Sequence, residues 1–173
     1  MTSVRTKIFI AASLAVLCFF NVSIFQKEQI RKNGETVLLE LAPADPRSLM
    51  QGDYMRLNYK IGAGIPALSE VPAEGRIVIA AGPDHVGYFV RDDDGAPLKD
   101  GEKRLRYRHD HGTVIVPNSF MFQEGNADVY RRAKYGVFKF DGPDHYLLVG
   151  LADESRKQIE APDRPLNFDA NPR

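Results

Sequence analysis

Hydrophobic residues follow two different patterns along the chain. From Ile8 to Phe25 the sequence is almost entirely apolar and carries no charge, whereas beyond residue 33 short apolar runs alternate with Gly, Pro and Asp. The first run is about 18 residues long, and at about 1.5 Å per residue a helix over it spans roughly 27 Å, close to the thickness of a bilayer's hydrocarbon core. The pattern therefore predicts a transmembrane helix over 8–25, followed by a body of a different kind.

Two other interpretations of this run are a cleaved signal peptide and a buried helix of a soluble core. Signal cleavage requires small residues just before the cut. Residues 21–25 read Asn-Val-Ser-Ile-Phe and offer no small-x-small pair, so we favour an uncleaved signal anchor. Cys18 follows the large Leu17, and apolar sequence continues beyond it, which speaks against lipidation. We interpret Cys18 as a small apolar residue of the helix.

The body contains eight short runs rich in β-branched and aromatic residues, each bounded by turn-forming residues. They cover 35–41, 54–61, 76–81, 86–91, 103–109, 113–116, 135–140 and 146–151. No long amphipathic segment lies between them, which disfavours a parallel βαβ arrangement. The spacing predicts a mainly β fold, an antiparallel β-sandwich or small barrel of about eight strands. One short helix is expected at 127–133, with Asn126 as its N-cap.

These patterns divide the chain into five segments. We expect a short basic segment at 1–7, the anchor at 8–25, a juxtamembrane linker at 26–33 able to continue the helix, an exported β-rich domain at 34–153 and a flexible tail at 154–173. The tail is assigned from its prolines and its position at the end of the chain.

Charge adds an orientation to this organisation. The 23 basic and 23 acidic residues cancel, but residues 1–32 hold five basic residues against one acidic residue, so the head carries +4 and the remainder −4. A short basic head before an apolar run is typical of an export signal, so we expect the N-terminus inside and the body outside. The neutral total gives no reason to expect a nucleic-acid partner, and a single Cys excludes an internal disulfide and a Cys-rich metal site.

The tetrapeptide Gly-Pro-Asp-His occurs twice, at 82–85 and 142–145, each time between two apolar runs. Pro presets the first central position of a turn and Asp tolerates the second, so each copy predicts a hairpin tip. Asp-His pairs are also metal ligands, as is the His-Asp-His sequence at 109–111. Turns at the tips of different hairpins need not meet, so we expect no metal and no cofactor.

Arg104, Arg106 and Arg108 alternate with Leu105 and Tyr107. Because side chains alternate along a strand, three guanidinium groups are expected on one face. Such a row can bind phosphate, lipid head groups or an acidic partner. We favour the simpler interpretation, a solvated outer face balanced by acidic neighbours. These neighbours are Asp92, Asp93, Asp94, Asp100 and Glu102.

Two motifs resemble those of a known family. Residues 52–59 have the spacing Gly-Asp-Tyr-x-x-Leu-x-Tyr, and a second signature follows at 120–125, 130 and 133–136. The chain thus resembles the GDYXXLXY protein family of bacterial membrane-anchored proteins, which has no assigned activity. The resemblance implies a single-pass protein of the bacterial inner (cytoplasmic) membrane with a periplasmic domain. Motif positions expected to be structural are Gly52, Leu57, Tyr59, Gly125, Tyr130, Ala133, Tyr135 and Gly136.

Alternation places Leu57 and Tyr59 on the core face of the motif strand and Tyr54 on the other face. Asp53 is expected to bond amides of its own turn, or alternatively to form a small polar site with Arg47 and Tyr54. A second carboxylate, at position 124, either caps the following helix or faces a ligand. The candidate partner- or ligand-binding residues are Arg47, Asp53, Tyr54, Glu124, Arg104, Arg106 and Arg108.

Together these features predict a membrane-anchored, non-enzymatic domain that binds an integral membrane partner. One alternative is an envelope hydrolase distantly similar to signal peptidases, with Ser48 as the nucleophile. The segment from Ser48 lacks the Ser-Met step and the following Pro of that pattern, and Lys60 on the polar face is a poor base at neutral pH. The other alternative is an anionic lipid- or phosphate-binding module that uses the arginine row.

Overall fold

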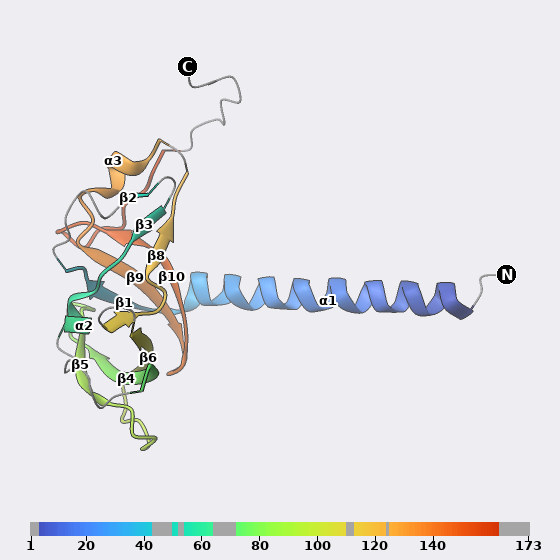
Figure 1. Cartoon of the computed structure of the whole chain (residues 1–173), viewed down its shortest axis with the longest axis horizontal. Helices are drawn as coiled ribbons and strands as arrows, with labels where there is room; N and C mark the ends of the chain where they lie inside the picture. Colours follow the sequence, from blue (N-terminus) through green and yellow to red (C-terminus); the bar gives the residue numbers. More distant parts are fainter. Residues whose placement is uncertain are drawn as a thin grey trace.

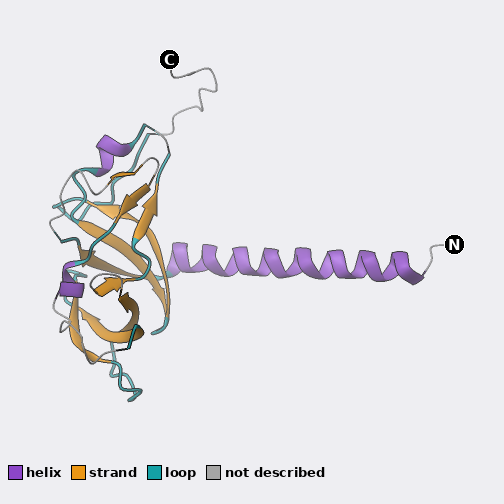
Figure 2. Ribbon diagram, in the orientation of Figure 1, coloured by secondary structure: helices purple, strands orange, loops and turns teal. Residues whose placement is uncertain are grey.

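The structure is a computed structural model of the chain, and it describes residues 4–42, 50–51, 54–63, 72–109, 113–123 and 125–162. A long helix, α1 (Val4–Asn33), projects from the side of a β domain that is elongated across the helix axis (Figure 1). Strands and loops make up nearly all of this domain (Figure 2). The two patterns seen in the sequence thus correspond to two physically separate parts of the molecule.

Helix α1 is uninterrupted over 30 residues, and none of them is buried. Large apolar side chains such as Phe9 and Phe19 are exposed around its whole circumference. A helix that is apolar all round requires an apolar environment. By length and composition α1 can cross a membrane, which is compatible with a single-pass anchor. Its exposure contradicts the interpretation of 8–25 as a core helix, and the polar residues 26–33 continue the helix as predicted.

Three antiparallel sheets form the β domain. The first has the order β1-β9-β10, made by β1 (Glu35–Glu40), β9 (Tyr135–Asp141) and β10 (His145–Ala152). The second has the order β5-β4-β6-β7, made by β5 (Gly87–Asp92), β4 (Glu74–Ala81), β6 (Glu102–His109) and β7 (Thr113–Ile115). The third is small, with the order β2-β3-β8, made by β2 (Met50–Gln51), β3 (Tyr54–Arg56) and β8 (Ser119–Met121). Two four-residue helices are α2 (Lys60–Ala63) and α3 (Ala127–Tyr130).

One hydrophobic core joins the three sheets. Phe138 of the first sheet, Leu105 of the second and Leu57 beside the third are fully buried in the same cluster. The first two sheets also meet through the backbone, where the Leu38 amide donates to the His85 carbonyl at 2.8 Å. The result is a sandwich-like, mainly β fold, as predicted, and the described strands do not close into a barrel.

The predicted strand at 54–61 is divided. β3 ends at Arg56, and α2 begins at Lys60. Between them the chain bonds to two different segments. The Leu57 amide donates to the Asn118 carbonyl at 2.7 Å, and Tyr59 then forms a β-bridge with Leu41. The inward-facing side chains of this segment remain buried, so the predicted alternation is confirmed although the continuous strand is wrong.

Both Gly-Pro-Asp-His tetrapeptides lie at hairpin tips, as predicted. Residues 82–85 connect β4 to β5, and residues 142–145 lead from β9 into β10. The two hairpins belong to different sheets. Their tips are therefore fixed by separate pairs of strands.

Two local predictions are corrected. Asn126 occupies the N-cap position of α3 as predicted but makes no capping bond, and its side-chain amide donates to the Pro162 carbonyl at 3.4 Å. The helix α3 ends at Tyr130 rather than at residue 133. The tail predicted from residue 154 is folded back over 154–162: Ile159 is buried in the core and its amide donates to the Leu151 carbonyl. Residues 163–173 lie outside the described residues.

Candidate functional site

The two family-like motifs form one structural unit. β3, from the first motif, pairs with β8, from the second, so that Tyr54 lies opposite Met121 and Met55 lies opposite Phe120. Segments more than sixty positions apart in the sequence therefore share one small sheet. This pairing explains why both signatures occur in one domain.

Most described motif positions build the core. The Tyr59 hydroxyl donates to the Pro117 carbonyl at 3.0 Å, and its ring meets Phe138 edge to face at 5.6 Å. Burial raises the pKa of Tyr59 above its usual value, which keeps the hydroxyl protonated as a donor. Gly136 lies against this ring, since a Cβ there would stand 2.9 Å from the Tyr59 ring. Leu57 is fully buried beside it.

The second motif adds an aromatic cluster. The ring of Tyr130 lies 5.2 Å from that of Phe120 and 5.4 Å from that of Phe122. Gly125 adopts a φ of 80°, a left-handed conformation that favours glycine. Ala133 and Tyr135 are half-buried. The described motif positions thus serve the fold.

Tyr54 is the exception in the first motif. It is 39% exposed, and Met121 opposite it is 80% exposed, so the pair presents an apolar patch on the outer face of β3 and β8. The candidate residues expected around Tyr54 are not described. Arg47, Gly52, Asp53 and Glu124 all lie outside the described residues.

The arginine row is divided by its partners. The predicted alternation is confirmed, because Leu105 and Tyr107 are buried while Arg106 and Arg108 are exposed. Arg104 lies on the same face but is covered by the β5–β6 loop, with its side chain only 18% exposed. Its guanidinium donates to the Asp93 carboxylate at 2.9 Å and the Ala96 carbonyl at 3.2 Å, and it lies 3.4 Å from the Asp144 carboxylate. Arg104 therefore joins the β5–β6 loop to the tip of the β9–β10 hairpin.

Arg106 and Arg108 remain on the surface and gain a neighbour that the sequence analysis missed. Arg76 of β4 lies opposite Arg106, and Glu74 lies opposite Arg108. Arg76 approaches the Asp144 carboxylate at 3.8 Å, and Arg108 donates to the Asn118 side chain at 3.5 Å. A hollow runs over this face, with Arg76, Arg106 and Arg108 among its lining residues. Arg76 could not be added from the sequence because it depends on the register between β4 and β6.

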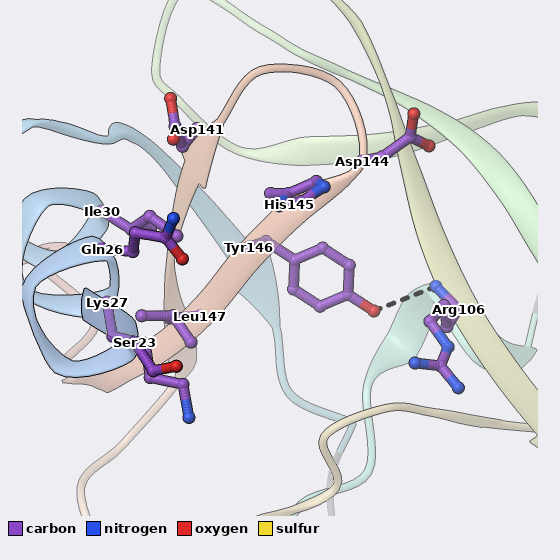
Figure 3. Close-up of a pocket in the computed structure, with 10 residues that line it drawn as sticks. All are labelled: Ser23, Gln26, Lys27, Ile30, Arg106, Asp141, Asp144, His145, Tyr146 and Leu147. Atoms are coloured by element: carbon purple, nitrogen blue, oxygen red, sulfur yellow. Dashed lines mark hydrogen bonds between the residues drawn. The ribbon is translucent and has the colours of Figure 1, made fainter. Parts of the chain in front are cut away.

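A second hollow, of about 600 Å³, lies between the end of α1 and the β domain (Figure 3). Ser23 and Lys27 of α1 line one side, and Arg106 lines the other. Between them stands Tyr146, whose hydroxyl accepts from the Arg106 amide at 3.0 Å and donates to the Val116 carbonyl at 2.7 Å. Arg106 thus belongs to both hollows, on a backbone held in place by β10.

The proposed metal ligands have other partners. Asp84 pairs with Arg156 at 2.9 Å, and Asp144 is approached by Arg104 and Arg76. Among the residues that the structure describes, no three His, Cys, Asp or Glu side chains form a metal-binding group. Of the His-Asp-His sequence only His109 is described.

The residues of the hydrolase alternative do not form a described site. Ser48 lies outside the described residues. Lys60 is exposed, and its amine lies 3.2 Å from the Glu40 carboxylate.

Comparison with other proteins gives a single result. No curated protein and no solved structure matches the chain. A family model described as "GDYXXLXY protein" matches residues 16–151, which include the end of α1, the β3–β8 unit and all three sheets. Both motifs are present and joined in one folded unit, so the chain belongs to the GDYXXLXY protein family.

Proposed function

We propose that the protein is a single-pass protein of the bacterial inner membrane whose β domain lies on the periplasmic side, and that this domain is non-enzymatic and binds an integral membrane protein. The basic head and the apolar helix support the anchor and its orientation. The resemblance of the two motifs to a family of bacterial membrane-anchored proteins supports the compartment.

The observation that carries the proposal is the junction between α1 and the β domain. Only Gly34 separates the helix from β1. The Gly34 amide donates to the Ile30 carbonyl at 2.9 Å, and the Gly34 carbonyl accepts from the Lys139 amine at 3.0 Å. A domain joined in this way stays at one height above the membrane. It therefore meets integral membrane proteins more often than freely diffusing ones.

The Tyr54–Met121 patch is the surface we assign to the partner. Its two side chains are exposed, whereas Met55 and Phe120 on the other face of the β3–β8 unit pack against the core. Aromatic residues and Met are enriched in protein interfaces. An exposed tyrosine beside an exposed methionine is a pair of the kind that contacts another protein.

The first experiment introduces a photo-cross-linking amino acid at Met121 of the full chain in its native membrane. We expect one discrete adduct containing an integral membrane protein, and its loss when Tyr54→Ala is added. The matched control carries the cross-linker at Tyr88, which is also exposed but lies on β5. Equal adducts at both positions, or none at Met121, would contradict the assignment of the patch.

The second experiment tests the topology separately. In a Cys18→Ser background, Ser155→Cys supplies one thiol on the exposed β domain. The protein should remain in the membrane pellet after alkaline carbonate extraction. A membrane-impermeant thiol reagent should label it in cells whose outer membrane has been permeabilised. Labelling only after the inner membrane is broken would place the domain in the cytoplasm and refute the orientation.

The hydrolase alternative makes a distinct prediction. If Ser48 were a nucleophile, Ser48→Ala would abolish the cellular function while leaving the protein anchored and folded. The binding proposal predicts that, in cells from which the gene for this protein has been deleted, Ser48→Ala restores the lost cellular function as well as the unchanged protein does. Tyr54→Ala should fail in the same assay.

A further inference from the structure

Arg106 lies at the level where the apolar part of α1 ends. The hollow in Figure 3 is lined by Ser23, inside the apolar run, and by Lys27, two residues beyond its end at Phe25. Arg106 lines the same hollow from the β domain. In a membrane crossed by α1, this is the depth at which acyl chains give way to phosphates. The position of Arg106 thus follows from the proposed anchoring of α1, and this inference rests on that part of the proposed function.

Charge on this face is unbalanced in a way that favours an anion. Arg76 and Arg106 stand directly opposite each other on neighbouring antiparallel strands. Like charges in this arrangement repel. The Arg106 guanidinium makes no ion pair or hydrogen bond to any residue that the structure describes, although its backbone is bound on both sides. A phosphate between the two guanidinium groups would relieve the repulsion.

Acidic groups near this face do not fill that role. Asp144 is shared between Arg104 and Arg76, so its charge is already offset. Asp141 lines the same hollow but stands at the end away from Arg106 in Figure 3. Glu74 lies opposite Arg108, one step along the sheet. What remains is a positive surface at Arg76 and Arg106, of which Arg106 lies across the hollow from Lys27.

We propose that Arg76 and Arg106, together with Lys27, bind the phosphate of an anionic phospholipid in the membrane leaflet from which α1 emerges. Guanidinium groups bind phosphate oxygens through paired N–H donors, and the ammonium of Lys27 adds a point charge from the helix. The Tyr146 hydroxyl holds the Arg106 backbone at 3.0 Å, so the arginine strand is ordered before the lipid arrives. The bound lipid would fix the rotation of the domain about α1.

The experiment uses the full chain in a detergent with a neutral head group. Native mass spectrometry counts lipid adducts as phosphatidylglycerol or phosphatidylcholine is titrated in. We expect phosphatidylglycerol to bind about tenfold more tightly than phosphatidylcholine, because phosphatidylglycerol has a net negative charge, whereas the choline ammonium of phosphatidylcholine offsets its phosphate and is repelled by the arginines. Raising NaCl from about 50 mM to about 500 mM should weaken the preference.

The test variant is Arg76→Gln with Arg106→Gln, and it should lose the preference. The control is Arg131→Gln with Arg132→Gln, which removes the same charge from exposed residues beside α3, at the other end of the domain from β4 and β6 in Figure 1. The control should bind as the unchanged protein does. Thermal unfolding of both variants checks that they fold, and Arg106→Lys, which keeps the charge but loses the paired donors, should show an intermediate preference.

Several outcomes would overturn the proposal. One is an unchanged preference for phosphatidylglycerol in the Arg76/Arg106 variant, and another is the lack of that preference in the unchanged protein. A third is competition by inorganic phosphate at the same concentration as phosphatidylglycerol, which would indicate a site for a soluble anion. None of these depends on the orientation or the protein partner. Release of the protein by carbonate, or absence of the Met121 cross-link, would refute the proposed function, whereas the lipid measurement in detergent has its own outcome.

Discussion

The Tyr59 hydroxyl donates a 3.0 Å hydrogen bond to the Pro117 carbonyl, across 58 positions of sequence. Pro117 comes two residues before β8, and Tyr59 is the last residue of the first motif. The bond therefore joins the two motifs beyond the end of β3, where β3 no longer pairs with β8. Among the described motif positions, Leu57 and Tyr59 form this internal connection.

Replacing Tyr59 by Phe should lower the free energy of unfolding by about 1–2 kcal/mol, because a buried carbonyl loses its donor while the ring is kept. Urea unfolding of the full chain in detergent measures the change. Tyr88→Phe, at a residue that is 55% exposed, is the matched control and should have almost no effect. Equal stability of the two variants would show that the bond contributes nothing.

Gly136→Ala should destabilise the domain by about 1–3 kcal/mol, because overpacking forces neighbours to shift. The added Cβ would stand 2.9 Å from the Tyr59 ring and 3.2 Å from the Phe138 ring. In a Tyr59→Leu background the cost of Gly136→Ala should be smaller, since the closest neighbour is gone. A cost that is the same in both backgrounds would place the strain elsewhere.

Arg104→Gln and Arg106→Gln should behave differently although the residues are two positions apart. Arg104 is mostly buried with Asp93, so its loss leaves a carboxylate without its partner and should cost at least about 2 kcal/mol of stability. Arg106 is exposed, and its replacement should leave the melting temperature nearly unchanged. Differential scanning fluorimetry compares the two variants. Equal melting temperatures would contradict the claim that Arg104 stabilises the fold and Arg106 does not.

Glu102 should contribute a pH-dependent part of the stability. Its carboxylate accepts the Lys99 amide at 3.0 Å and is bound by Arg91 at 3.1 Å, which together lower its pKa below the usual value of 4.5. A lowered pKa in the folded state means that the contribution is present above the unfolded value and is lost as the pH falls through the folded one. The melting temperature should therefore differ most between the unchanged protein and Glu102→Gln near neutral pH.

Below the usual pKa of 4.5 that difference should shrink, because protonated Glu102 loses its charge in both folded and unfolded chains. Glu154→Gln, at an exposed residue, is the control and should give a small difference at every pH. A difference in melting temperature between the unchanged protein and Glu102→Gln that grows as the pH falls would contradict this assignment.

Val16→Arg should prevent stable membrane insertion. Val16 lies in the middle of the apolar run, where an arginine costs roughly 2.5–3.5 kcal/mol on insertion scales. Carbonate extraction of membranes should release the Val16→Arg variant, while Val16→Leu stays in the pellet. Retention of both variants would exclude α1 as the anchor.

Much of the fold could be predicted because it depends on local pattern. The apolar run predicted α1, and the Gly-Pro-Asp-His turns predicted two hairpins, since Pro and Asp favour turns in any context. The inward position of Leu57 and Tyr59 followed from alternation alone. The family could be recognised from eight consecutive residues.

What was missed depends on contacts between distant segments. β2 and β8 are two and three residues long, too short to leave a pattern in the sequence. The buried position of Ile159 depends on a backbone bond to Leu151, and no local signal distinguishes it from a loose tail. Likewise the burial of Arg104 depends on its contacts with Asp93 and Asp144. The position of Arg76 opposite Arg106 depends on the register between β4 and β6.

The one-residue connection between α1 and β1 has a mechanical consequence. A transmembrane helix adjusts its tilt to the thickness of the bilayer. Gly34 is bonded to both the helix and β9, so as long as these two bonds hold, a change of tilt turns the β domain with the helix. Bilayers of different thickness would then change the orientation of Tyr54 and Met121 relative to the membrane surface.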